Sequence, residues 1–170
     1  MKKYLFMTVV LIAAALSLTS CGDDEPKDTV TVTGTYFMTF SQDLLNACNV
    51  FITYKAENGR NVMEAVTSTM WTKAVTSNKF PAEFGVMYKF STKSDAELTQ
   101  EQYDLTCDLN FSFRTSKGDA YTKNVTIINA PDVKKDKVVS TLDKYSGKST
   151  GFRVTKDGDV DPANSLNYDN

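Results

Sequence analysis

The stretch from Tyr103 to Arg114 alternates strictly between apolar and polar side chains. Successive side chains of a β-strand point to opposite faces of a sheet, so this period of two predicts a long strand with one dry and one solvated face. The apolar members are Tyr103, Leu105, Cys107, Leu109, Phe111 and Phe113. A chain whose clearest signal has this period is constrained to a layered β architecture.

The same alternation recurs in other segments that are bounded by turn residues. One segment places Val30, Val32, Tyr36, Met38 and Phe40 on one side and Thr31, Thr33, Thr35 and Thr39 on the other. Asn58-Gly59 predicts a hairpin between residues 48–54 and 62–66, because both turn residues tolerate a positive φ. Strands are also predicted at 84–90 and 121–128, and the run 67–75 is a further strand or an edge.

Helical signals are few. Ser94 and Glu97 have the spacing of a capping box, which predicts one or two helical turns through Gln102. A thin apolar stripe over 133–145 predicts a short C-terminal helix that ends near Gly147. The sequence therefore predicts an all-β protein, an antiparallel β-sandwich of six to seven strands with that helix. The 59 residues between Cys48 and Cys107 invite a comparison with immunoglobulin-like domains.

The amino terminus has the order of a secretory signal peptide. Met1-Lys2-Lys3 is followed by an apolar run over 5–18 and by small residues before Cys21. A stop-transfer helix would need about 20 apolar residues, and this run is shorter. Leu18-Thr19-Ser20-Cys21 resembles the lipobox of bacterial lipoproteins, which implies that Cys21 is lipidated and becomes the first mature residue. An ordinary cleavage site beside a stray cysteine is the alternative.

The residues after this cysteine are acidic. Gly22, Asp23, Asp24 and Glu25 resemble the surface-export signal of Bacteroidota lipoproteins, and the alternative is a solvated acidic linker. Asp28-Thr29-Val30 is similar to the O-glycan acceptor of the same bacteria, which makes Thr29 a candidate glycosylation site. These resemblances imply a lipid-anchored protein of the outer membrane at the cell surface, with a periplasm-facing position as the alternative.

The predicted organisation is a signal peptide over 1–20, a lipidated tether over 21–29, one β-sandwich domain over 30–155 and a polar tail over 156–170. Removal of the signal peptide leaves 150 residues, enough for one domain with a substantial core. It also leaves 17 basic and 21 acidic residues, a net charge of −4. A chain with this charge lacks the basic field that nucleic-acid partners require.

Histidine is absent from the sequence, which excludes Ser-His, Cys-His and His-metal sites. Of the carboxylate pairs, Asp104 and Asp108 are separated by about 13 Å on one strand face, beyond the reach of cooperating glycosidase carboxylates. Glu97 and Glu101 are typical of a solvated surface. We therefore expect a protein that is not an enzyme and holds no cofactor.

Two further sets of residues are candidates for specific chemistry. Cys48 and Cys107 fall on predicted inner faces, where we expect two buried thiols, with a disulfide as the alternative. Asp157, Asp159 and Asp161 have the alternate spacing of calcium-loop ligands. That comparison weakens because glycine and the bidentate carboxylate are missing downstream, so a disordered acidic tail is the preferred interpretation.

Exposed aromatic rings are the remaining candidates. Phe37, Phe51, Trp71 and Phe80 are out of phase with the core or lie in ambiguous segments. We expect a non-catalytic binding module for a glycan or an envelope protein, with Trp71 and Phe51 as the first rings to test. One alternative is a structural or assembly subunit of a surface appendage, which an apolar edge strand would favour. The other alternative is a carboxylate-based hydrolase.

Overall fold

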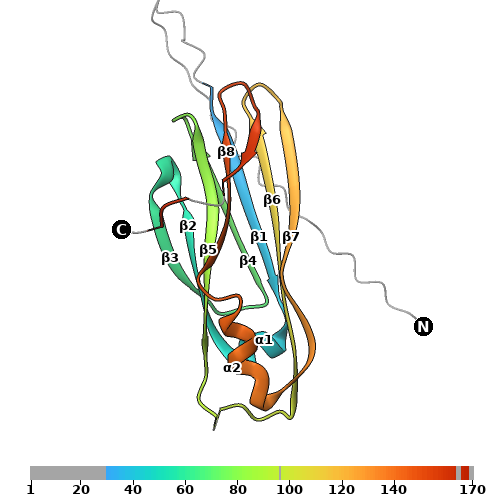
Figure 1. Cartoon of the computed structure of the whole chain (residues 1–170). Helices are drawn as coiled ribbons and strands as arrows, with labels where there is room; N and C mark the ends of the chain where they lie inside the picture. Colours follow the sequence, from blue (N-terminus) through green and yellow to red (C-terminus); the bar gives the residue numbers. More distant parts are fainter. Residues whose placement is uncertain (1–29, 96, 164–165, 169–170) are drawn as a thin grey trace, which may run out of the picture.

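The computed structural model describes residues 30–95, 97–163 and 166–168, which form two facing antiparallel sheets (Figure 1). Sheet A has four strands in the order β4 (Met70–Ser77), β1 (Val32–Phe40), β6 (Gln102–Thr115) and β7 (Ala120–Lys134). Sheet B has five strands in the order β3 (Asn61–Val66), β2 (Cys48–Lys55), β5 (Ala82–Thr92), β8 (Lys148–Val154) and β9 (Val160–Pro162). The predicted antiparallel β-sandwich is confirmed, with nine strands in the described residues instead of six or seven.

The predicted signal peptide and tether lie outside the described residues. The same is true of the individual candidates in that region, which are Cys21, Gly22, Asp23, Asp24, Glu25 and Thr29. Their predicted roles in lipidation, export and glycosylation remain predictions.

Short helices connect strands of opposite sheets. Helix α1 (Gln42–Ala47) leads from β1 to β2 and begins after Ser41, whose hydroxyl accepts a hydrogen bond of 3.2 Å from the Leu44 amide. This helix was not predicted, although an N-cap serine before an apolar pair is its expected signal. Helix α2 (Val138–Asp143), preceded by the 3₁₀ turn η2 (Lys135–Lys137), confirms a short C-terminal helix within a narrower range than the predicted 133–145.

One local prediction is wrong, and two others are confirmed. Asp95 and Glu97 lie in a turn, and no helix is present among the described residues 94–95 and 97–102, although the Glu97 carboxylate does accept bonds from the Ser94 amide and hydroxyl. The run around Trp71 is the edge strand β4, and the hairpin at Asn58-Gly59 contains the 3₁₀ turn η1 (Glu57–Gly59) with Asn58 at φ 59°. That left-handed conformation is the one for which asparagine is favoured.

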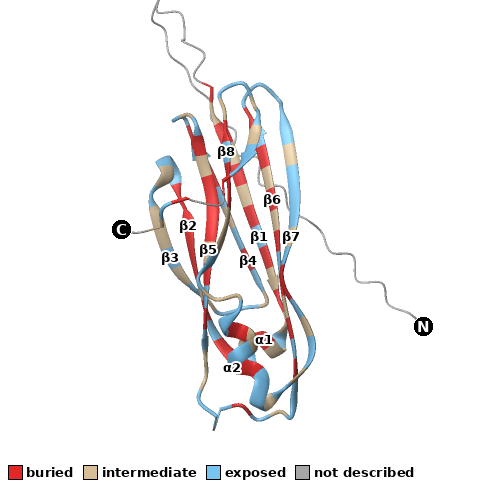
Figure 2. Cartoon of the chain, in the orientation of Figure 1, coloured by how far each residue is buried: buried red, intermediate tan, exposed pale blue. Residues whose placement is uncertain are grey.

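The core lies between the sheets and is built by the alternating strands, as the buried stripes on facing strands show (Figure 2). Its centre is a group of rings from both sheets: Phe84, Phe111, Phe113 and Phe152. Gly34 makes room for one of them, because a Cβ there would lie 2.6 Å from the Phe84 ring. The central strand β6 therefore carries the dry face that its sequence predicts.

Tyr36 of sheet A forms hydrogen bonds with the backbones of two neighbouring strands of sheet B, β2 and β5. Its buried hydroxyl donates to the Lys55 carbonyl at 2.7 Å and accepts from the Gly85 amide at 3.1 Å. The register of β2 with β5 ends one pair earlier, at Tyr54 and Val86. The phenol thus satisfies two backbone groups where the strands separate, as buried polar groups require.

The prediction of a polar, disordered tail over 156–170 is wrong for residues 160–163 and for Leu166. Residues 160–162 form β9 beside β8, and Ala163 and Leu166 are buried. They lie against the outer face of sheet B at two paired glycines, Gly85 and Gly151. A Cβ at Gly151 would come within 2.5 Å of the Leu166 Cδ1 atom. The glycines create the space that this segment occupies.

Candidate functional site

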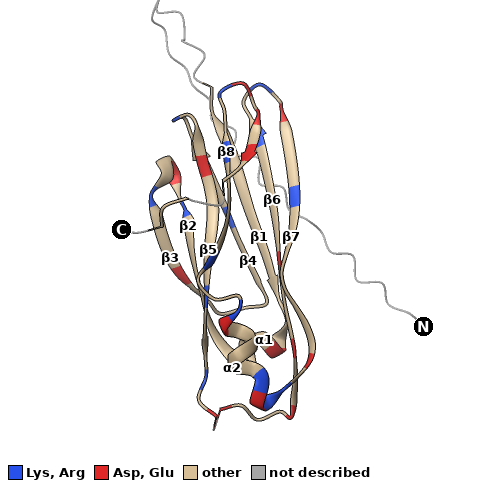
Figure 3. Cartoon of the chain, viewed as in Figure 1, with Lys and Arg blue, Asp and Glu red and all other residues tan. Residues whose placement is uncertain are grey.

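The outer face of sheet A is lined by small polar side chains. Its strands contribute, among others, Thr33, Thr35, Thr39, Thr72, Thr76, Asn110, Ser112, Thr122, Asn124 and Thr126, all half-buried or exposed. β1 carries no charged residue along its length (Figure 3). The inward residues of the same strands fill the core, so strand parity alone separates this face from the interior.

One aromatic ring interrupts this polar surface. Phe37 is 38% exposed and lies between Thr72 of β4 and Asn110 of β6, its paired neighbours on the two sides. A hollow of about 210 Å³ beside it is lined by Phe37, Thr39, Asp108, Asn110 and Asn124, together with Leu109 and Val125. We call this set the Phe37 groove.

The polar groups of the Phe37 groove are partly bonded to one another. The Asn110 amide nitrogen donates to the Asn124 side-chain oxygen, and the Thr126 hydroxyl donates to Asp108 Oδ1 at 2.7 Å. Within the described residues, this leaves the Asn110 oxygen, the Asn124 amide nitrogen and the second Asp108 oxygen without a protein partner. The groove therefore offers an apolar ring surrounded by oriented donors and acceptors, the combination that small-molecule sites use for orientation and specificity.

Trp71 is not an exposed platform, which corrects the prediction that it is a ligand-binding ring. It is only 8% exposed and packs on Tyr54 with ring centroids 5.3 Å apart. Its Nε1 donates to Glu64 Oε2 at 3.1 Å. β4, at the edge of sheet A, turns this side chain inward against the Tyr36 and Tyr54 rings.

Glu64 links the edges of both sheets. It also accepts a hydrogen bond of 3.2 Å from the Tyr54 hydroxyl and pairs with Lys73 Nζ at 2.9 Å. Desolvation by burial alone would raise the pKa of Glu64, but hydrogen bonds from Lys73, Trp71 and Tyr54 outweigh it and lower that pKa. The hydrogen bond to Glu64 raises the pKa of Lys73. This network closes the sandwich and leaves none of its aromatic rings free for a ligand.

Phe51 lies on the opposite side of the molecule, on the outer face of sheet B, where it is half-buried. It lines a hollow of about 400 Å³ together with Gln42 and Asn46 of α1 and with Lys93. The Lys93 ammonium donates to the Leu45 carbonyl at 2.8 Å and so caps the end of α1. The structure does not bring Phe51 and Trp71 into one site.

Cys48 and Cys107 are free and buried thiols on opposite sheets. Cys48 Sγ donates to the Leu44 carbonyl at 3.2 Å. Burial raises the pKa of Cys48 to about 12, against a smaller opposing effect of Lys93. Burial likewise raises the pKa of Cys107. Both side chains behave as small apolar core residues, because the thiolate is the reactive form and is disfavoured here.

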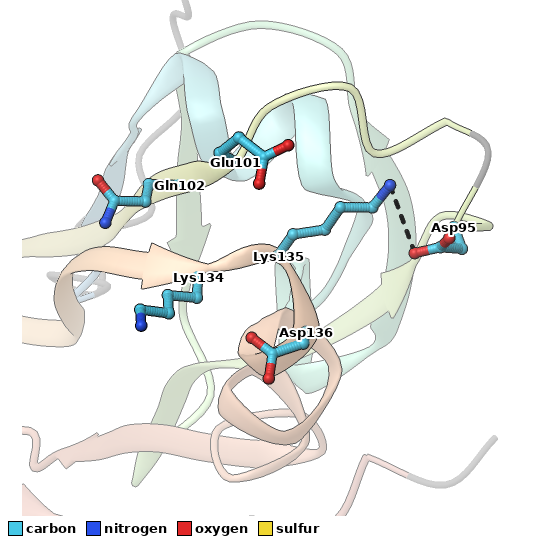
Figure 4. A pocket seen from close by; sticks show the side chains of 6 residues that line it. All are labelled: Asp95, Glu101, Gln102, Lys134, Lys135 and Asp136. Atoms are coloured by element: carbon cyan, nitrogen blue, oxygen red, sulfur yellow. Dashed lines mark ion pairs between the residues drawn. The ribbon is translucent and has the colours of Figure 1, made fainter.

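A hollow of about 600 Å³ lies at the end of the sandwich near α2 and is lined mainly by charged side chains (Figure 4). Lys135 reaches across it to Asp95, with 3.5 Å between Nζ and Oδ1. The carboxylates of Asp95, Glu101 and Asp136 lie at separate places around this lysine and do not face one another across a shared point. Carboxylate-based hydrolysis requires two such groups to meet across a substrate.

The three aspartates near the carboxyl end do not form a metal centre. Asp157 and Asp159 lie in the turn between β8 and β9, and Asp161 pairs in register with Arg153. Among residues 30–95, 97–163 and 166–168, no group of three or more Asp, Glu, Cys or His side chains is arranged to hold a metal ion. The weak calcium candidates gain no support from this geometry.

Comparisons with known proteins identify no relative: no family model, no curated protein and no solved structure matches the chain. Within the described part of the chain, no helix has the length and apolar character needed to cross a membrane.

Proposed function

We propose that this chain is a non-catalytic binding module that a lipid on Cys21 holds at the cell surface, and that it binds a glycan in the Phe37 groove. The observation that carries the proposal is an exposed Phe37 ring on a polar, almost uncharged sheet face, beside side-chain amides and a carboxylate. The proposed lipid anchor and the proposed location at the cell surface rest on the resemblance of residues 18–25 to lipoprotein sequences.

A sugar ring matches this surface chemically. It presents an apolar C–H face, which can pack on an aromatic ring, and a rim of hydroxyl groups, which both donate and accept hydrogen bonds. Asn110 and Asn124 supply one acceptor and one donor, and Asp108 supplies a second acceptor. The hollow of about 210 Å³ is smaller than the roughly 300–1,000 Å³ of sites for drug-sized ligands, so it suits one ring of a longer chain.

Calorimetric titration with a panel of neutral and acidic oligosaccharides tests the proposal. The protein should lack residues 1–21, and wild type should be compared with Phe37→Ala. We expect at least one glycan to bind and Phe37→Ala to weaken its binding about tenfold, because the contact area of the ring is lost.

Phe51→Ala is the matched control, since it removes the same ring from the opposite sheet and should leave glycan affinity unchanged. The proposal is wrong if no glycan binds, or if Phe37→Ala binds as well as the wild type.

A structural or assembly subunit is the second candidate, and one observation favours it. β7 is a 15-residue strand at the edge of sheet A, where β6 is its one partner among the described strands, and long edges invite strand addition. Lys123 and Pro131 on this strand are features that natural proteins use to prevent such pairing. Sedimentation of the protein without residues 1–21 distinguishes the two functions, because an assembly subunit should self-associate at high concentration.

A further inference from the structure

A second hollow lies beyond the Phe37 groove on the same face of sheet A. This hollow has a volume of about 540 Å³ and is lined by Thr33, Thr35, Ser112, Phe113, Arg114, Ala120 and Thr122. The two sets come from consecutive outward positions of the same three strands, β1, β6 and β7. On β6 the outward residues run from Asp108 through Asn110 and Ser112 to Arg114, a length of about 20 Å.

Arg114 is the one cation that lines either hollow. It is exposed, and within the described residues its guanidinium has neither an ion pair nor a side-chain hydrogen bond. The neighbouring side chains of Ser112 and Thr122 are neutral, and the carboxylate of Asp108 lies at the other end of the face, about 20 Å away along β6. A guanidinium presents a planar fork of donors that matches a carboxylate with two parallel hydrogen bonds.

We propose that the two hollows together hold a linear glycan that contains uronic acid, with a sugar ring on Phe37 and a carboxylate on Arg114. This inference rests on the proposed function and specifies its ligand class. Arg114 is four residues beyond Asn110, the register partner of Phe37, so the two contacts lie about 13 Å apart. A single sugar cannot span that distance, so an extended oligomer is required.

Charge also orients the chain in this groove. Asp108 lies at the Phe37 end and would repel a second carboxylate, whereas Arg114 attracts one at the other end. A uronate unit is therefore favoured at Arg114, and a neutral ring or the apolar face of a uronate lies over Phe37. Because both contacts are exposed, added salt should weaken the charged one.

The experiment compares acidic oligomers with their own methyl esters. The probes are oligomers of galacturonate, of guluronate and mannuronate, and of glucuronate, each paired with the fully methyl-esterified form, which keeps the rings and removes the charge. With the wild-type protein lacking residues 1–21, we expect at least one acid to bind about tenfold more tightly than its ester at low salt, the fold-change typical of a hydrogen bond to a charged group. The monomeric uronate should bind weakly or not at all.

Variants of Arg114 identify the contact. Arg114→Gln should remove the preference for acid over ester, and Arg114→Lys should retain part of it, because the charge remains but the fork is lost. Lys89→Gln is the matched control, since Lys89 is an exposed cation on the outer face of sheet B. Unchanged thermal unfolding should accompany each of these surface substitutions.

The outcomes separate this inference from the proposed function. Equal affinity for acids and esters, or an acid preference that survives Arg114→Gln, overturns the uronate assignment while Phe37-dependent binding of neutral glycans would still support the proposed function. If neither acidic nor neutral glycans bind, both proposals fail.

Discussion

Glu64 is an acidic side chain at the open side of the sandwich, where residues of β2 and β4 donate hydrogen bonds to it. A carboxylate in this position stabilises the fold only while it is charged. Because the pKa of Glu64 is lowered in the folded state, its contribution is present above the unfolded value of about 4.3 and is lost as the pH falls through the lower folded value.

The first prediction follows from Trp71, the only tryptophan, which donates to this carboxylate. We expect its fluorescence emission to change as acid protonates Glu64, at a pH below the ordinary range for a glutamate because its pKa is lowered. Glu64→Gln should remove that transition, because an amide does not titrate, whereas Glu57→Gln in the exposed turn η1 should preserve it. An unchanged acid transition in Glu64→Gln would show that another group controls the environment of Trp71.

At basic pH, the contribution of Lys73 to stability depends on pH in the opposite direction. Because the pKa of Lys73 is raised by its bond to Glu64, its contribution is present below the unfolded value of about 10.4 and is lost as the pH rises through the higher folded value. The Glu64–Lys73 pair should therefore be intact from mildly acidic to mildly basic pH. Its partial exposure limits its effect on stability, since solvent screens such pairs.

At the scale of elements, Ala163 and residues 166–168 lie across the outer face of sheet B. We call these residues the strap. Lys55, on the outer face of β2, is buried because this strap covers it, and its ammonium donates to the Asn167 carbonyl. Tyr168 lies beside it, with the Lys55 ammonium 5.4 Å from the ring centroid. The strap therefore provides the partners that a buried lysine needs.

The second prediction tests the strap through Gly151. Gly151→Ala places a Cβ 2.5 Å from Leu166 Cδ1 and 2.9 Å from the Ala163 carbonyl oxygen, so the strap must shift. Overpacking of this kind costs about 1–3 kcal/mol of the free energy of unfolding, which urea denaturation measures. Hydrogen exchange should increase at Ala163 and at residues 166–168.

Ser149→Ala is the control for this substitution, because Ser149 lies on the same strand and the same face, two residues from Gly151, and already carries a Cβ. It should change the free energy of unfolding little. Equal stability of Gly151→Ala and the wild type would mean that the strap contributes nothing to folding.

At the scale of the whole molecule, packing and the connecting segments hold the two sheets together, and no disulfide joins Cys48 and Cys107. The two thiols lie on different sheets and are reached by solvent only when the sandwich opens. Their accessibility therefore reports the separation of the sheets.

The third prediction uses these thiols in the protein without residues 1–21. A thiol-reactive dye should not label the native protein, and both cysteines should react at one rate that follows global unfolding in urea. A reductant should leave the melting temperature unchanged. Lys89→Cys supplies an exposed thiol that should react at once; a melting temperature that falls on reduction would reveal a disulfide and contradict the prediction.

Alternation within single strands was enough to predict the fold class and the face of the sheet on which the candidate site residues lie. The core faces of β1, β2, β5 and β6 follow from period two, and the same parity turns Phe37 and Arg114 outward. These properties are local, because the direction of a side chain in a strand depends only on its position along that strand.

Contacts between distant segments decided the rest. Trp71 is buried against Tyr36 and Tyr54 of other strands, and the strap depends on Gly85 and Gly151, which are far apart in sequence and adjacent in the ladder. The joining of Phe37, Asn110 and Asn124 into one groove likewise requires the strand order β1, β6, β7. The sequence by itself determined which way each side chain points along its strand, and the tertiary structure decided which strands lie side by side, because pairing partners are chosen by packing across the whole chain.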